Sequence, residues 1–238
     1  MKRKLNMIFN FSTNKQFSTD IKVNGEVIET VNEARLLGTI ISSDLKWEAN
    51  TKYLVAESNK RLRLLHNAYK FTRNKQHLKQ IYMLQVRCKL EQAAPVWHHS
   101  LTKAEISSLE RVQRAACRII FGDRYKSYED SLQVLKMDTL EKRRNKLTLS
   151  FAKSSLKLEK MRKLFPLNDS NHEMVKRSFE KYKVIKAKTE RYKSSAVINI
   201  QRMLNEEEEK NVRTYQGVVS NVLRTYDSVE PISLRKFT

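Results

Sequence analysis

Residues 102–122 read TKAEISSLERVQRAACRIIFG, and this stretch decides the fold class. Thr102 and Glu105 form a capping box, in which each side chain bonds a backbone amide near the helix start. Gly122 is the residue type that most often ends a helix, because it adopts positive φ without strain. Apolar residues recur between these ends at helical spacing: Ile106, Leu109, Val112, Ala116, Ile119 and Ile120. The stretch therefore predicts an amphipathic helix.

Helical spacing continues on both sides of this stretch, from about residue 50 onward. The predicted helices cover about 54–69, 78–90, 127–136, 138–156, 172–188 and 190–210. Asp138 with Glu141 is expected to cap the helix that follows it. Glu206–Glu209 would fall at the unfavourable C-terminal end of a helix dipole, which predicts fraying there. The whole chain has four Gly and three Pro, too few for a fold built on strands and turns.

The N-terminal residues 5–41 have a different pattern, with short apolar runs typical of strands. Asn24-Gly25 lies between alternating apolar residues and predicts a β-hairpin. The apolar residues around Gly38 predict a third strand. The predicted fold is therefore mainly α, with a small N-terminal antiparallel β-sheet followed by a multi-helix bundle. The predicted divisions are 1–48 (β-rich), 49–166 (helical), 167–210 (basic helical) and 211–238 (tail).

The chain is strongly basic, with 47 Lys and Arg against 26 Asp and Glu and a net charge of +21. The excess lies within residues 51–200, because 1–50 and 201–238 are close to neutral. A folded basic surface favours a polyanionic partner, nucleic acid before membrane. Cys88 and Cys117 fall in helical patterns and are expected to be core residues of an intracellular protein. No apolar run is long enough to predict a membrane span.

Three clusters of cations are candidate nucleic-acid contacts. They are Lys60, Arg61 and Arg63; Arg111, Arg114 and Arg118; and Lys142, Arg143, Arg144 and Lys146. The middle three share one side of their helix and are suited to a phosphate backbone. The alternative is a solvated surface in which Glu110 pairs with Arg114. Aromatic residues are the other candidates for base contacts: Tyr69, Phe71, Tyr82 and Tyr125. A core role is the alternative for these rings.

The motifs that serve catalysis are not found in the sequence. It contains no Gly-rich phosphate loop, no metal-binding spacing of its five His, and no Asp-Asp pair. His98-His99 follows Trp97 at a predicted corner and is interpreted as structural or solvent-facing. Two-metal polymerase chemistry needs converging carboxylates. We therefore expect no catalytic residue, no metal site and no cofactor in this chain.

Several blocks, in order, resemble the end of the reverse transcriptase of non-LTR retrotransposons, the jockey-like elements and their relatives. The blocks are Leu36-Leu37-Gly38-Thr39-Ile40-Ile41, Asp44-Leu45-Lys46-Trp47, Lys60-Arg61-Leu62, Ile81-Tyr82, residues 90–97 (LEQAAPVW), Leu101-Thr102, residues 109–116 (LERVQRAA), residues 118–122 (RIIFG) and residues 138–144 (DTLEKRR). Weaker blocks are Thr189-Glu190-Arg191 and Gln201-Arg202-Met203-Leu204. The resemblance covers roughly residues 5–205.

The resemblance implies the last palm strands, then the thumb and the segment after it. Leu36, Leu37 and Gly38 would lie near the primer grip, where Leu36 replaces an aromatic residue that is frequent in the family. The family's catalytic aspartates and fingers lie upstream, and the intact enzyme needs Mg²⁺. The chain is therefore expected to be a truncated polymerase product that binds template–primer duplex without catalysis. The family expectation for its location is the nucleus rather than the cytoplasm.

Two alternatives to this reading remain open at the level of the sequence. In the first alternative, the chain is a helical protein–protein interaction module from a domesticated or decayed element, because strands without palm neighbours leave an exposed edge. In the second, it works as an enzyme with palm and fingers supplied by another chain. Salt-sensitive duplex binding would favour the polymerase remnant, whereas a protein partner that co-purifies would favour the module.

Overall fold

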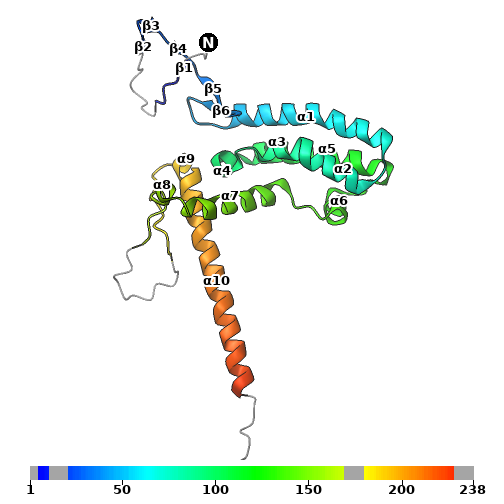
Figure 1. Ribbon diagram of the computed structural model, residues 1–238, viewed down its shortest axis with the longest axis vertical. Helices are drawn as coiled ribbons and strands as arrows, with labels where there is room; N and C mark the ends of the chain where they lie inside the picture. The colour runs from blue at the N-terminus through cyan, green and yellow to red at the C-terminus, as the bar shows by residue number, and fades with distance from the viewer. Residues whose placement is uncertain (1–4, 11–20, 169–179, 228–238) are drawn as a thin grey trace, which may run out of the picture. The chain divides into compact units, whose positions relative to one another are not determined.

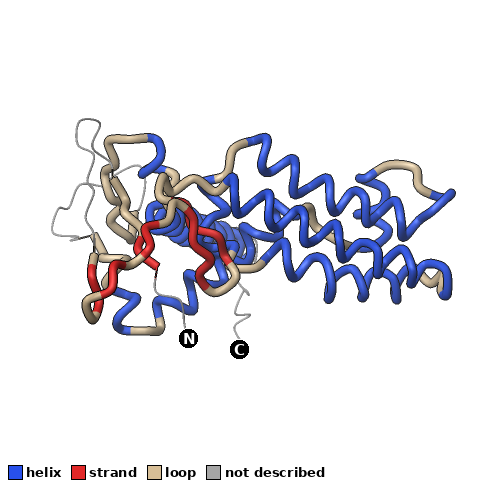
Figure 2. The backbone as a smooth tube through the Cα atoms, turned by 90° about the horizontal axis from the view of Figure 1, so that it is seen from above, coloured by secondary structure: helices blue, strands red, loops and turns tan. Residues whose placement is uncertain are grey.

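The computed structural model describes residues 5–10, 21–168 and 180–227. The described chain is mainly helical with small N-terminal strands, which confirms the predicted fold class (Figures 1 and 2). The chain forms two compact units: Met1–Phe151 with Ser194–Ala196, and Ala152–Lys193 with Val197–Thr238. The predicted divisions lie after residues 48, 166 and 210. The observed one falls after Phe151, inside the helix Leu140–Leu156.

Six short strands precede the helices in the part of the chain that the structure describes. They are β1 (Leu5–Asn6), β2 (Lys22–Val23), β3 (Glu26–Val27), β4 (Glu29–Thr30), β5 (Glu33–Leu36) and β6 (Thr39–Ser42). The α-helices are α1 (Glu48–Phe71), α2 (Lys75–Ile81), α3 (Cys88–Glu91), α4 (Ala94–Trp97), α5 (Lys103–Phe121), α6 (Tyr128–Leu135), α7 (Leu140–Leu156), α8 (Glu159–Arg162), α9 (Glu190–Lys193) and α10 (Ala196–Asp227). A π-helix, η1 (Tyr82–Arg87), joins α2 to α3, and the 3₁₀ turns η2 (His98–Ser100) and η3 (Gly122–Arg124) flank α5.

The strands form three separate pairs instead of one sheet. The predicted hairpin at Asn24-Gly25 is confirmed: β2 and β3 are antiparallel, and both turn residues have positive φ, as a type I′ turn requires. The pair β1–β4 is parallel, with Leu5 opposite Glu29. The predicted antiparallel pairing is therefore confirmed for β2–β3 and β5–β6, while the described strands do not join into a single sheet.

The segment around Gly38 is a hairpin, where a single strand was predicted. Strands β5 and β6 pair with Leu36 opposite Thr39, and Leu37-Gly38 forms the two-residue turn. Leu37 has φ +49° and Gly38 has φ +85°, so the chain reverses here. The apolar residues on both sides of Gly38 belong to two strands, which a single apolar pattern does not distinguish.

Helix α5 begins and ends where the sequence predicts. The Thr102 hydroxyl accepts the Glu105 amide at 3.3 Å, and the Glu105 carboxylate accepts the Thr102 amide at 2.6 Å. Gly122 ends the helix with φ +53° and ψ −130°, a conformation that is essentially restricted to glycine. At α7, Thr139 instead of Asp138 accepts the Lys142 amide, so the predicted cap is displaced by one residue.

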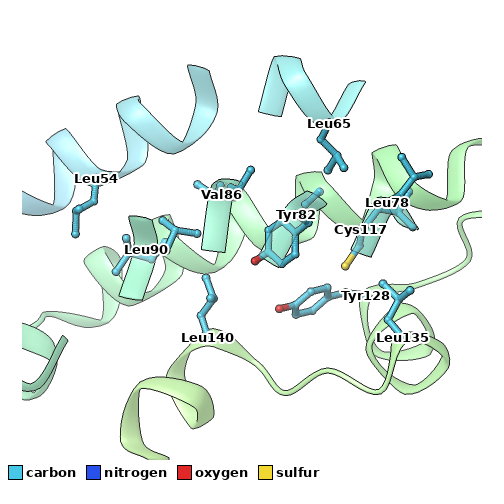
Figure 3. Close-up of a cluster of buried hydrophobic side chains, with 14 of the residues drawn as sticks. Leu54, Leu65, Leu78, Tyr82, Val86, Leu90, Cys117, Tyr128, Leu135 and Leu140 are labelled. Atoms are coloured by element: carbon cyan, nitrogen blue, oxygen red, sulfur yellow. The ribbon is translucent and has the colours of Figure 1, made fainter. Parts of the chain in front are cut away.

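The core of the first unit lies between α1, the α2–η1–α3 segment, α5 and α6, and Figure 3 shows part of it. Leu78, Tyr82, Val86 and Leu90 are all fully buried and follow each other at steps of four residues. In an α-helix each such step advances by about 40° beyond a full turn. The wider turns of η1 rotate less per residue, which keeps the four side chains in the core. Trp97 is also fully buried and donates its indole N–H to Gln92 O at 2.9 Å.

The second unit is organised by two amides on α10. Asn205 exchanges hydrogen bonds with the Tyr182 backbone N–H and C=O, at 2.8 and 2.9 Å. Gln201 accepts the Ile185 amide at 3.1 Å and donates to Leu164 O at 3.0 Å. These bonds hold residues 180–185 in an extended conformation against α10. The predicted helix at 172–188 is therefore wrong for 180–188, and its first part, 172–179, lies outside the described residues.

The acidic run Glu206–Glu209 lies in the middle of α10, which continues to Asp227. Glu207 pairs with Lys153 at 2.6 Å, Glu208 with Lys181 at 2.7 Å and Glu209 with Arg213 at 2.5 Å. The predicted fraying is therefore wrong, because cations from three segments stabilise the run. The predicted tail at 211–238 is helical up to residue 227, and residues 228–238 lie outside the described part.

Candidate nucleic-acid interface

The first predicted cluster lies on α1, and its three cations differ in their surroundings. Lys60 pairs with Glu57 at 2.7 Å. Arg61 donates from Nη1 to Gln85 O at 3.0 Å, which fastens α1 to η1. Arg63 is exposed, and among the described residues no carboxylate pairs with it. Arg63 is therefore the member of this cluster with the most accessible charge.

The three arginines of the second cluster lie on the outer side of α5, opposite its buried residues. Arg111 donates to the Ser108 hydroxyl at 2.8 Å. The Arg114 and Arg118 guanidinium carbons lie 5.1 and 5.7 Å from the ring centroids of Tyr128 and Tyr125. Arg111 and Arg118 are exposed and Arg114 is half-buried. Within the described chain, no carboxylate forms an ion pair with this row, so its positive charge is available to a ligand.

Glu110, the alternative partner of Arg114, belongs to a buried polar network instead. It accepts the Tyr128 hydroxyl, and it accepts the Leu140 amide at 3.1 Å. Gln113 accepts the Tyr82 hydroxyl at 2.7 Å and donates to the Tyr128 oxygen at 2.8 Å, between two rings that Figure 3 places side by side. Burial, and then the bond to Glu110, raises the pKa of Tyr128. A lone glutamine in a helical pattern gives no signal of a buried network, so the role of Gln113 could not be recognised from the sequence.

The third cluster, on α7, is divided between surface and interior. Lys142 and Lys146 both pair with Asp138, at 3.4 and 2.5 Å, and the hydrogen bond from Lys146 lowers the pKa of that carboxyl. Arg143 reaches Glu91 at 3.2 Å, where Arg87 also binds at 3.1 Å. These three cations are partly neutralised by acids of the same chain, so less of their positive charge is available to a ligand.

Arg144 corrects the prediction for this cluster, because its side chain is 0 % exposed and cannot reach a surface ligand. Its Nε donates to Nδ1 of His98 at 3.1 Å, and its guanidinium lies 5.8 Å from the Trp97 ring centroid. His98 Nε2 lies 3.0 Å from the Asn145 amide oxygen. Burial, followed by the charge of Arg144, lowers the pKa of His98 to about 4. His98 is therefore neutral at pH 7, accepting at Nδ1 and donating from Nε2.

The predicted primer-grip segment forms the exposed tip of the β5–β6 hairpin. Leu36 is 59 % exposed and Leu37 is 91 % exposed. Behind the tip, Gln92 donates to Leu37 O at 3.1 Å, and a Cβ at Gly38 would overlap the Gln92 amide. Lys89 in turn donates to Gln92 Oε1 at 2.6 Å. The hairpin tip is thus an exposed apolar projection, and the hydrogen bond from Gln92 fixes its position.

The three cation clusters contact local partners, and no hydrogen bond or ion pair between described residues joins one cluster to another. Helices α1 and α5 pack against each other, so the first two clusters belong to one helical layer (Figure 1). Among the described residues, no group of three or more His, Cys, Asp or Glu side chains is arranged to hold a metal ion. Cys117 is buried as predicted, whereas Cys88 is exposed, which corrects its assignment to the core.

None of the helices within residues 5–10, 21–168 and 180–227 has both the length and the apolar character of a membrane span. Comparison with known proteins found no matching family model, no matching curated protein and no matching solved structure. The relationship to reverse transcriptases therefore stays a prediction from the residues quoted above.

Proposed function

We propose that this chain binds nucleic acid with little sequence preference and is a non-catalytic part of a non-LTR retrotransposon reverse transcriptase. The observation that carries the proposal is the arginine row on α5. Arg111, Arg114 and Arg118 lie on the outer side of a helix whose other side packs in the core. No carboxylate of a described residue forms an ion pair with them. Such a row contacts phosphates at regular intervals along a backbone.

The binding is directed at the phosphate backbone. The chain carries a net charge of +21, and the cations of α5 are exposed or half-buried. Each phosphate neutralised by such a cation releases counterions, so affinity falls steeply as salt rises. Base identity is read only by groups that reach base edges, and a row of arginines along a helix provides no fixed code for them. Tolerance of sequence follows from this.

The role proposed within the resemblance is that of a thumb and the segment after it. The exposed hairpin tip at Leu36–Gly38 would lie beside the primer end, and the duplex would run along the cations of α1 and α5. The catalytic aspartates and their Mg²⁺ would belong to a palm and fingers that residues 1–238 do not include. Without them, the chain is proposed to bind duplex without extending it, in the nucleus rather than the cytoplasm.

A titration of labelled RNA–DNA hybrid with the full chain tests this proposal. Two hybrids of unrelated sequence should bind with similar affinity, and the affinity should fall at least about 10³-fold between 50 and 200 mM salt. Absence of binding at the lower salt concentration would contradict the proposal. Primer extension by the purified chain with Mg²⁺ and nucleotides would contradict its non-catalytic part.

A second candidate function is protein–protein interaction, which the exposed apolar residues before α1 favour. Val27 is 59 % exposed, and Leu36 and Leu37 add a projecting apolar tip. The strand pairs also leave edges open among the described residues. If hybrid binding fails while a defined protein partner co-purifies and is lost on Leu37→Lys substitution, this second function replaces the first.

A further inference from the structure

One end of the helical layer gathers residues from two distant parts of the sequence. We call it the bundle tip: residues 69–75, where α1 ends and α2 begins, and residues 118–126, where α5 ends and η3 follows (Figure 1). A Cβ at Gly122 would overlap the Tyr69 hydroxyl, so the two segments touch. Lys75 Nζ also lies 4.4 Å from the Phe121 ring centroid. The two segments therefore form one surface.

The charge of the bundle tip is almost entirely positive. Its cations are Lys70, Arg73, Lys75, Arg118, Arg124 and Lys126, and Asp123 is its one acid. Within the described chain, no carboxylate lies within ion-pairing distance of any of these six cations. This differs from the cluster on α7, where Asp138 neutralises Lys142 and Lys146. The bundle tip is thus a concentrated positive site with which no carboxylate of residues 5–10, 21–168 and 180–227 forms an ion pair.

Three of these cations are held against aromatic rings. Arg73 lies 4.0 Å from the Tyr69 ring centroid, and Arg118 lies 5.7 Å from that of Tyr125. Lys75 lies over Phe121, as described above. Cation–π contacts fix the direction of these long side chains, so less conformational entropy is lost when they bind an anion.

Phe71 is the aromatic residue of the bundle tip that no cation covers. It is the last residue of α1 and is 90 % exposed, between Lys70 and Arg73. A phenyl ring in water among cations is suited to stack on a nucleic-acid base while the neighbouring charges hold the phosphates. Bases inside a duplex are already stacked on each other. A free ring therefore selects an unpaired base.

We propose that the bundle tip binds a single strand of RNA or DNA, with a base stacked on Phe71 and phosphates held by the cations around it, of which Arg73, Lys75 and Arg118 are oriented in advance by their rings. This inference rests on the proposed nucleic-acid binding and adds a second, strand-selective contact to it. The arginine row on α5 would hold the duplex, and the bundle tip would hold the unpaired strand that extends from it.

The test compares three labelled probes with the full chain: oligo(dT), oligo(U) and a blunt RNA–DNA hybrid of the same length. Phe71→Ala should weaken binding of the single strands by about fivefold or more, because one base loses its stacking partner. Hybrid binding should change by less than about twofold, since the charges that hold its phosphates remain. Phe71→Trp should retain single-strand affinity, and Phe71→Leu should behave like Phe71→Ala. Phe151→Ala, at another exposed Phe, is the matched control and should leave all three affinities unchanged.

The outcomes separate this inference from the proposed function. If the hybrid binds and Phe71→Ala leaves single-strand affinity unchanged, the bundle tip inference is overturned and the proposed function stands. If neither hybrid nor single strand binds at low salt, both are overturned. If poly-glutamate displaces oligo(U) as well as unlabelled oligo(U) does, the bundle tip takes an acidic peptide and the strand assignment is overturned. A difference between oligo(dT) and oligo(U) assigns the strand to DNA or RNA.

Discussion

Arg144 and His98 form a buried hydrogen-bonded pair in which the guanidinium Nε donates to the imidazole Nδ1 at 3.1 Å. The pair joins α7 to the 3₁₀ turn after α4, beside the buried Trp97. A cationic side chain from a run of three basic residues, 142–144, thus packs in the interior of the protein. Its role is therefore structural, which leads to the first prediction.

Arg144→Ala is expected to lower the free energy of unfolding by about 2–4 kcal/mol, because it opens a cavity and leaves His98 Nδ1 without its donor. Arg144→Met should cost much less, since an apolar chain fills the space and no charge stays buried. Urea unfolding of both variants measures this, with Lys142→Ala as the exposed control. Equal effects of Arg144→Ala and Lys142→Ala would contradict the buried role.

The neutral His98 makes stability depend on pH. Its folded pKa of about 4 lies below the value of 6.5 for an unperturbed His, so the unfolded state binds the proton more tightly. Stability from this group is present above pH 6.5 and is lost as the pH falls from 6.5 towards 4, by roughly 3 kcal/mol at most. Urea midpoints across this range measure the slope. His98→Gln should reduce it, and an unchanged slope in that variant would refute the assignment.

Gly122 is expected to tolerate substitution less well than Gly25. Gly122→Ala should cost about 2–4 kcal/mol, because it places a side chain at φ +53° and against the Tyr69 hydroxyl. Gly25→Ala should cost about 1 kcal/mol, since it has φ +85° but nothing within 4 Å of the new Cβ. Thermal unfolding compares them. Tyr69→Phe should partly restore Gly122→Ala, and no rescue would argue against the overlap.

The buried network around Gln113 gives a fourth prediction. Gln113→Leu should lower the free energy of unfolding by about 2–3 kcal/mol, because the hydroxyls of Tyr82 and Tyr128 each lose a partner in the core. Gln133→Leu, at an exposed position on α6, is the matched control and should change stability by less than about 0.5 kcal/mol. Denaturant unfolding measures both, and similar values for the two would contradict the network.

Two single substitutions compare an unpaired cation with a paired one. Arg111→Gln should weaken hybrid binding at low salt and reduce the slope of log affinity against log salt by about 1. Lys146→Gln should have a smaller effect, because Asp138 already neutralises that lysine. Anisotropy titrations at several salt concentrations measure both slopes. A larger effect of Lys146→Gln would move the interface from α5 to α7.

Local signals in the sequence predicted local structure well. The Thr102–Glu105 cap, the Gly122 stop and the Asn24-Gly25 turn are hydrogen-bonding or φ preferences of a few adjacent residues, and all three are confirmed. These features form without help from distant parts of the chain, so the residues alone specify them.

Features that depend on distant partners were missed. Arg144 looks like its basic neighbours in the sequence, and only packing against His98 and Trp97 shows that it is buried. Residues 180–185 were predicted as helix, but backbone amides of this segment donate to Gln201 and Asn205 on α10 instead of to each other. The sequence of the segment gives no sign of these distant partners. The bundle tip joins segments about 50 residues apart, so its charge could not be recognised from either segment alone.

The π-helix at Tyr82–Arg87 has a consequence for how this chain tolerates changes in length. Removing one residue there and restoring ordinary α geometry would keep Leu90 in the interior, because the eleven remaining steps from Leu78, at about 100° each, come within about 20° of three full turns. Gln92 would then keep its hydrogen bond to the hairpin at Leu37. A single deletion elsewhere in the α2–η1–α3 rod would instead turn every later residue by about 100°. Length variation among natural or engineered versions of this rod should therefore be confined to 82–87.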